Sequence, residues 1–184
     1  MSEIKNLYIQ PADKVAKSLL GKYLIRKRGK KIEAYRIVET EAYLGPHDKA
    51  CHSHKGRTKR TEVMYGPPGH WYVYLCYGMH DMLNLVTGPN GYPAAVLIRG
   101  VEGAVGPGRL TKKLGITRAL NGKPVSKKSG LWIEDRGEKV NPRDTMRTPR
   151  IGVGYAEEWK DKPLRFVLKN YLPGEKKRGT KGGR

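Results

Sequence analysis

The fold is decided by the stretch Ile37-Val38-Glu39-Thr40-Glu41-Ala42-Tyr43, in which two carboxylates interrupt a run of branched and aromatic residues. Such residues are typical of β-strands. Side chains on an extended chain alternate between two faces, which groups them as Ile37, Glu39, Glu41 and Tyr43 on one face and Val38, Thr40 and Ala42 on the other. An acid beside an aromatic ring on a rigid strand indicates a catalytic site. The alternative is an edge strand with its acidic face in solvent, the usual position of acidic residues.

The sequence around this stretch predicts a single, strand-rich domain. A chain of 184 residues is about the size of one domain. We expect a domain over residues 1–172 and a basic, disordered tail over 173–184. Helical spacing and glycine stops predict helices over 11–21 and 107–114, with a helical turn over 155–160. The predicted strands cover residues 22–28, 32–43, 71–77, 82–87, 93–99, 131–133, 151–154 and 164–168. The predicted loops cover residues 47–69, 121–130 and 137–148.

The charge balance points to a polyanionic partner. The chain has 37 Lys and Arg against 17 Asp and Glu, a net charge of +20, and nucleic acid is the leading candidate. In proteins whose charges serve thermostability alone, the proportion of Glu rises together with that of Lys. The proportion of acidic residues is not raised in this chain. The chain has 11 Tyr and 3 Trp but 1 Phe, so nearly every ring carries a polar group and suits a wet stacking surface.

Cysteine usage and the N-terminal residues bear on location. The two cysteines, Cys51 and Cys76, are too few for a disulfide framework. The opening residues, Met-Ser-Glu-Ile, have no apolar signal core, and no run is long enough to span a bilayer. We therefore expect an intracellular protein, cytoplasmic or associated with the nucleoid, with no membrane partner.

A cluster of possible metal ligands lies in the long loop and consists of His47, Cys51, His52 and His54. Zinc sites usually have paired ligands at fixed intervals. The adjacent pair Cys51-His52 fits none of these intervals, and no second pair follows at the proper distance. We expect neither a metal nor another cofactor, although a zinc-binding interaction domain stays open as an alternative.

Two other segments suit contact with DNA. The helix predicted over 107–114 carries Arg109, Lys112 and Lys113, and its free backbone N–H groups could bind a phosphate. The strand predicted over 71–77 ends at Tyr77, where a hairpin would project the ring outward as a DNA-bending wedge. Aromatic strands are more often part of a core, so one face of this strand is expected to pack.

Several motifs, in this order, resemble those of the alkyladenine (3-methyladenine) DNA glycosylases of the AAG/MPG type. The motifs lie at residues 36–46, 50–53, 72–79 with Asn84, 106–110, 150–154 with Trp159, and 162–166. They cover the chain to about residue 170. The resemblance implies a mixed α/β (α+β) fold, a single domain with a curved antiparallel sheet flanked by short helices. This expectation agrees with the strand-rich pattern.

The resemblance also implies an activity. A base-excision-repair enzyme of this kind flips alkylated or deaminated purines out of double-stranded DNA and hydrolyses the N-glycosidic bond with an activated water. The substrate class includes 3-methyladenine, 7-methylguanine, hypoxanthine and ethenoadenine. The product is an abasic site, with no lyase step. The partner is double-stranded DNA containing damaged purines, and the protein is expected to act as a monomer.

By resemblance, individual residues acquire roles. Alternation alone does not choose between Glu39 and Glu41, whereas the resemblance makes Glu41 the general base. The other implied roles are Arg99 holding the water, Tyr43, His52 and Tyr74 forming the base pocket, Asn84 discriminating against the amino group of guanine, and Tyr77 intercalating into the duplex. A non-catalytic nucleic-acid-binding module is the main alternative, but it leaves Glu41 beside Tyr43 unexplained.

Overall fold

A central strand of 13 residues, β2 (Lys31–Tyr43), carries both Glu39 and Glu41. Its first half pairs with β1 (Tyr23–Arg28). Its second half lies between β5 (Ala94–Val101) and β9 (Arg165–Leu168), each of which pairs with Glu39, Thr40 and Glu41. The edge-strand alternative is therefore wrong, because this part of β2 has a partner strand on both sides.

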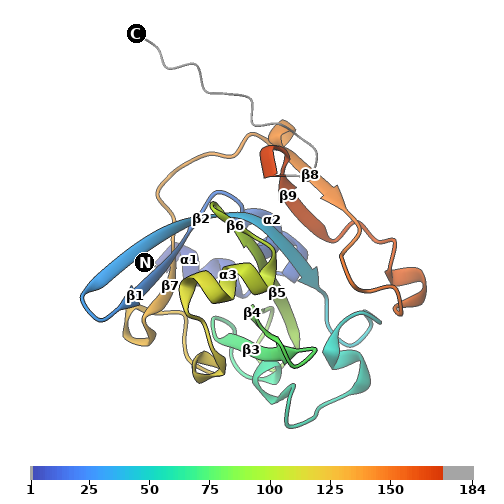
Figure 1. Cartoon of the computed structure of the whole chain (residues 1–184). Helices are drawn as coiled ribbons and strands as arrows, with labels where there is room; N and C mark the ends of the chain where they lie inside the picture. The colour runs from blue at the N-terminus through green and yellow to red at the C-terminus, as the bar shows by residue number, and fades with distance from the viewer. Residues whose placement is uncertain (1, 172–184) are drawn as a thin grey trace.

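The computed structural model describes residues 2–171, and its sheet is antiparallel at every pairing. The remaining strands are β3 (Trp71–Cys76), β4 (His80–Thr87), β6 (Ala104–Val105), β7 (Leu131–Glu134) and β8 (Thr145–Thr148). The nine strands follow the order β3-β4-β5-β2-β1-β7, with β6 beside β5 and β8 beside β9. The helices are α1 (Ser2–Tyr8), α2 (Ala12–Leu19) and α3 (Pro107–Leu114). Figure 1 shows these short helices against the curved sheet, so the predicted fold class is confirmed.

Helix α2 packs on the core face of β2. Its apolar side chains, Val15, Ala16 and Leu19, are buried at helical spacing. The hydroxyl of Thr40 donates a hydrogen bond of 2.9 Å to the Ala16 carbonyl. Thr40 therefore faces the helix, and its neighbour Glu41 faces the other side of the sheet.

The strict alternation expected for β2 fails at its middle. The register with β5 shifts between Ile37 and Thr40, and Ile37 packs in the main hydrophobic core together with Val38. A bulge of this kind bends a strand and changes the face of a residue. Alternation therefore holds from Glu39 onwards, and Ile37 does not share the acidic face.

The predicted helix over 107–114 is confirmed, and Gly115 ends it in a left-handed conformation with a φ of 57°. The predicted hairpin is also confirmed, with Gly29-Lys30 as its two-residue turn. The observed β9 begins one residue later than the strand predicted over 164–168. Element ends are commonly uncertain by that amount.

Two local predictions differ from the structure, and one helix was missed. The segment over 151–154 is not a strand, because the Ile151 amide donates to a side chain, Glu41, instead of a neighbouring strand. The predicted loop over 137–148 contains β8, which pairs with β9, and α1 was not predicted.

The predicted basic tail over 173–184 lies outside the described residues. Residues 2–171 contain no helix with the length and apolar character needed to cross a membrane.

Thr40 offers a test of the two-faced strand. Replacing Thr40 with Val removes the hydrogen bond to Ala16 and should lower the free energy of unfolding by about 1–2 kcal/mol. Chemical denaturation measures this change. Thr40→Ser retains the hydroxyl and should recover the hydrogen-bond contribution. A Val variant as stable as the wild type would contradict the placement of Thr40 against α2.

Candidate active site

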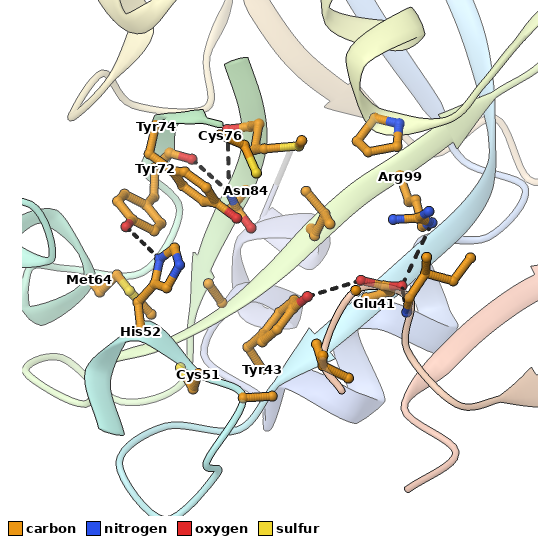
Figure 2. A pocket seen from close by; sticks show the side chains of 18 of the residues that line it. Glu41, Tyr43, Cys51, His52, Met64, Tyr72, Tyr74, Cys76, Asn84 and Arg99 are labelled. Carbon is orange, nitrogen blue, oxygen red and sulfur yellow. Dashed lines mark hydrogen bonds and ion pairs between the residues drawn. The ribbon is translucent and has the colours of Figure 1, made fainter. Parts of the chain in front are cut away.

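One face of four neighbouring strands, β3, β4, β5 and β2, lines a cavity of about 510 Å³. The loop after β2 covers one side of it and contributes His52. Figure 2 shows the strand residues that point into this space, among them Glu41, Tyr43, Tyr72, Tyr74, Asn84 and Arg99. A cavity of this size can hold a purine-sized molecule. Side chains far apart in the sequence therefore meet because the sheet places alternate residues of each strand on the same face.

Glu41 is fully buried and held by two donors. The Tyr43 hydroxyl donates to Oε2 at 3.0 Å, and the Ile151 backbone N–H donates to Oε1 at 2.9 Å. Arg99 Nε lies 3.6 Å from Oε1. Burial raises the pKa of the Glu41 carboxyl, while Arg99, the Ile151 amide and the Tyr43 hydroxyl act in the opposite direction. The side chain is thus a fixed carboxyl whose raised pKa makes its ionised form a stronger base than an exposed carboxylate.

Glu39 lies behind Glu41 and does not line the cavity. Its Oε1 accepts a hydrogen bond of 2.6 Å from Arg165 Nε and lies 2.8 Å from Arg99 Nε. The contact with Arg99 is an ion pair without hydrogen-bond geometry. Glu39 therefore neutralises the inner side of Arg99, and only Glu41 of the two acids can reach a bound molecule.

An aromatic wall lies across the cavity from Glu41. The His52 and Tyr74 ring centroids are 4.6 Å apart with an interplanar angle of 67°, and His52 Nδ1 lies 3.0 Å from the Tyr72 hydroxyl. Burial lowers the pKa of His52 to about 4, with further lowering by Arg60 and Lys55. His52 is therefore an uncharged ring at neutral pH.

Asn84 is fixed beneath this wall. Its side-chain amide donates to the carbonyls of Tyr72 at 3.1 Å and Met82 at 3.3 Å. Because both donor hydrogens are used in this way, the amide group lies in one orientation at the floor of the cavity.

Tyr77 stands at the tip of the β3–β4 hairpin and is 87% exposed. The Met79 N–H donates to the Cys76 carbonyl at 3.1 Å, and φ is positive at both central residues, Tyr77 (48°) and Gly78 (68°). Positive φ at both positions defines a type I′ turn, which is uncommon for a tyrosine. The turn presents the ring to solvent at the mouth of the cavity, which Tyr77 also lines.

The basic residues of α3 differ in their surroundings. Pro107 at the start of the helix lines the cavity, and Arg109, Lys112 and Lys113 are all exposed. Lys113 donates to the Gly103 carbonyl at 3.2 Å, and its ammonium lies 5.5 Å from the Tyr35 ring centroid. The Lys113 ammonium therefore already has contacts within the protein before any anion binds.

The possible metal ligands of the loop each have a different partner. The partner of His47 is the Tyr92 hydroxyl, that of His54 is the Pro46 carbonyl, and that of Cys51 is the Ser53 hydroxyl. Among residues 2–171, no three His, Cys, Asp or Glu side chains are grouped as metal ligands.

Sequence reasoning missed several contributors to the cavity. The Arg60 guanidinium lies 4.8 Å from the Tyr74 ring centroid, but nothing in its basic loop distinguishes it from its neighbours. The Ile151 contribution comes from the backbone and carries no residue-type signal. Tyr72 could have been found, because it shares the strand face of Tyr74.

The chain is similar to one family along most of its length. A family profile described as methylpurine-DNA glycosylase (MPG) matches residues 6–105 and 101–172. A protein of Methanocella arvoryzae is 48% identical, with 90% of this chain and 92% of that protein covered. A protein of Myxococcus xanthus is 45% identical (94% and 96% covered), and one of Legionella pneumophila strain Lens is 48% identical (85% and 88%). All three relatives carry the name "Putative 3-methyladenine DNA glycosylase".

The ionisation of His52 tests the aromatic wall. Its imidazole should titrate with a midpoint of about 4, well below the usual value of about 6.5. NMR of ¹⁵N-histidine-labelled protein measures this midpoint, and a His52→Gln variant assigns the signal. A midpoint near 6.5 would mean that His52 is not buried among these rings.

Proposed function

Because this chain belongs to the methylpurine-DNA glycosylase family, we propose that it removes alkylated and deaminated purines from double-stranded DNA by hydrolysing the N-glycosidic bond. The class includes 3-methyladenine, 7-methylguanine, hypoxanthine and ethenoadenine. Family membership makes the chain a DNA glycosylase of DNA repair that acts on damaged DNA. The observation that carries the finer proposal is the buried carboxylate of Glu41, which faces the aromatic wall of Tyr72, Tyr74 and the neutral His52 across a purine-sized cavity.

A base inside a duplex is out of reach of such a cavity, so the nucleotide must rotate out of the stack. Flipping costs a few kcal/mol and is least costly for a damaged or mispaired base. Tyr77, exposed at the cavity mouth, is suited to fill the gap that the base leaves. The net charge of +20 suits attraction to the phosphates, and Arg109, Lys112 and Lys113 are the proposed backbone contacts.

The aromatic wall favours purines alkylated at N3 or N7. These bases carry a positive charge, and the ring of Tyr74 in this wall, together with that of Tyr43 beside Glu41, attracts a cation over its face. His52 adds no repulsion because its low pKa keeps it neutral at physiological pH. Asn84, fixed at the floor, is proposed to exclude the 2-amino group of undamaged guanine. Neutral lesions gain less from the rings and need protonation as they leave.

The proposed chemistry is attack by water on C1′ of the flipped nucleotide. Glu41 accepts a proton from the water as the C1′–O bond forms, while the C1′–N bond breaks and the base leaves with the bonding electrons. The sugar passes through an oxocarbenium-like state, which an adjacent carboxylate stabilises. Arg99, with its Nε side facing Glu39, can direct its terminal nitrogens toward the water.

This chemistry leaves an abasic site and an intact strand. Water rather than a lysine amine attacks C1′, so no Schiff base forms and no lyase step follows. We therefore propose a monofunctional glycosylase that acts as a monomer. A non-catalytic binding module would have no use for a buried carboxyl with two fixed donors.

Glu41→Gln tests the proposal. The amide is nearly isosteric but cannot accept the proton, so base release should fall by roughly 100- to 10,000-fold. Release of free base from duplexes containing 3-methyladenine or hypoxanthine measures this loss, and gel-shift binding to the same duplexes should stay close to wild type. The wild-type strand should break only after alkali treatment. A Gln variant with substantial activity would eliminate Glu41 as the base.

Tyr77→Ala tests the intercalating role. Loss of the ring should reduce the preference for lesion-containing over undamaged duplex by roughly tenfold, since stacking on one base contributes about 1–3 kcal/mol. Tyr77→Phe keeps the ring and should retain the preference. Equal preference in the Ala variant and the wild type would count against insertion of Tyr77.

A further inference from the structure

A completely buried ion pair lies next to the cavity but does not line it. The side chains of Asp48 and Arg150 are both 0% exposed, with Oδ2–Nη1 and Oδ1–Nη2 distances of 2.6 and 2.8 Å. The two residues come from the loop after β2 and the loop before β9. Burying such a pair removes two charges from water and often gives no net stability. The buried ion pair therefore indicates a role other than stabilising the fold.

Further hydrogen bonds hold the two side chains of the pair in place. The Asp48 carboxylate also accepts the Leu44 and Ala50 backbone N–H groups, both at 3.0 Å. Arg150 Nη1 also donates to the carbonyl of Ala42, at 2.8 Å. The Arg150 side chain is therefore anchored both to the loop and to β2 itself, next to Glu41.

From this anchored position, Arg150 and the residue after it contact the active site at two points. Its guanidinium lies 4.8 Å from the centroid of the Tyr43 ring. Because Tyr43 lines the cavity and Arg150 does not, the guanidinium supports the ring from behind. The residue that follows, Ile151, donates its backbone N–H to Glu41 Oε1 at 2.9 Å. One side chain thus fixes the place of a pocket ring and of a donor to Glu41.

We propose that the Asp48–Arg150 pair is a positioning element of the active site, which holds the Ile151 N–H on Glu41 and the Tyr43 ring against the base. This inference rests on the proposed function of Glu41. Neither residue touches the substrate. The planar guanidinium is needed because it binds both carboxylate oxygens and stacks on the ring, whereas a lysine ammonium can do only part of this.

Disturbing the Asp48–Arg150 pair should change the pH dependence of activity, because the pair affects the pKa of Glu41. Besides the Ile151 amide, the charged or titratable groups that act on Glu41 are Tyr43 and Glu39 on β2, Arg99 on β5, Tyr74 on β3 and Arg150 itself. The Ile151 hydrogen bond lowers the pKa of Glu41, so loosening it should raise that pKa. Since Glu41 must be ionised to act, activity should then be lost first on the acid side and recover at higher pH.

A purely structural role would consist of joining the two loops. The chain offers a control for this, because Lys49 makes an ion pair with Glu157 at 2.5 Å and with Glu158 at 2.9 Å. This exposed contact joins the same two loops without touching Tyr43 or Ile151. Removing it should weaken the loop connection but leave the environment of Glu41 unchanged.

The decisive experiment compares Arg150→Lys with the double variant Glu157→Gln/Glu158→Gln. Single-turnover release of 3-methyladenine is measured from pH 5 to 9. The acid-side midpoint should move up by about one pH unit in Arg150→Lys, the equivalent of one hydrogen bond to a charged group. The double variant should keep the wild-type midpoint. An unshifted midpoint in Arg150→Lys, or the same shift in both variants, would overturn the proposal.

A second measurement needs neither DNA nor activity. In ¹⁵N-isoleucine-labelled wild-type protein, the Ile151 amide signal should titrate with Glu41, and this titration should disappear in Glu41→Gln. In Arg150→Lys, which keeps the positive charge but cannot make both bonds to Asp48, the titration should move to higher pH. An Ile151 amide that does not follow Glu41 in the wild type would also refute the proposal. If the wild type releases no base at all, the proposed function fails instead, whatever the amide shows.

Discussion

The structure depends on how two carboxylates are accommodated inside a sheet. Glu39 and Glu41 lie two positions apart on one face of β2, with exposures of 2% and 0%. Buried like charges repel each other and lose hydration, so each needs a cationic or hydrogen-bonding partner. The neighbouring strands supply the cations, Arg99 from β5 on one side and Arg165 from β9 on the other. This requirement matches the position of β2 between those two strands.

The two faces of β2 have different roles, since one packs in the hydrophobic core and the other faces the cavity. Thr40 is bonded to α2 in the core, while Glu41 faces the cavity. The hydrophobic core on one side keeps the sheet rigid, so the groups on the other side are fixed before any ligand arrives. Fixed groups lose little entropy on binding and need little rearrangement during a reaction. The loops then complete the site, with His52 from one and the Ile151 amide from another.

The sequence predicted the features that depend on local periodicity. Alternation placed Glu41 and Tyr43 on one face, and glycine and proline signals gave α3 its observed ends. Periodicity could not separate Glu39 from Glu41, because that difference arises from Arg165, 126 residues away from Glu39. It also failed at 151–154, where an apolar pattern suggested a strand but the amide bonds to a side chain. The Asp48–Arg150 pair, 102 residues apart in sequence, carries no local signal at all.

A crystal structure of the Glu41→Gln protein bound to a lesion-containing duplex would test the proposed use of this site most directly. We expect the damaged purine between Tyr43, His52 and Tyr74, with C1′ of its sugar beside residue 41 and Tyr77 in the vacated position of the duplex. A base that stays stacked in the duplex, or that binds away from the cavity lined by Glu41, would contradict the assignment.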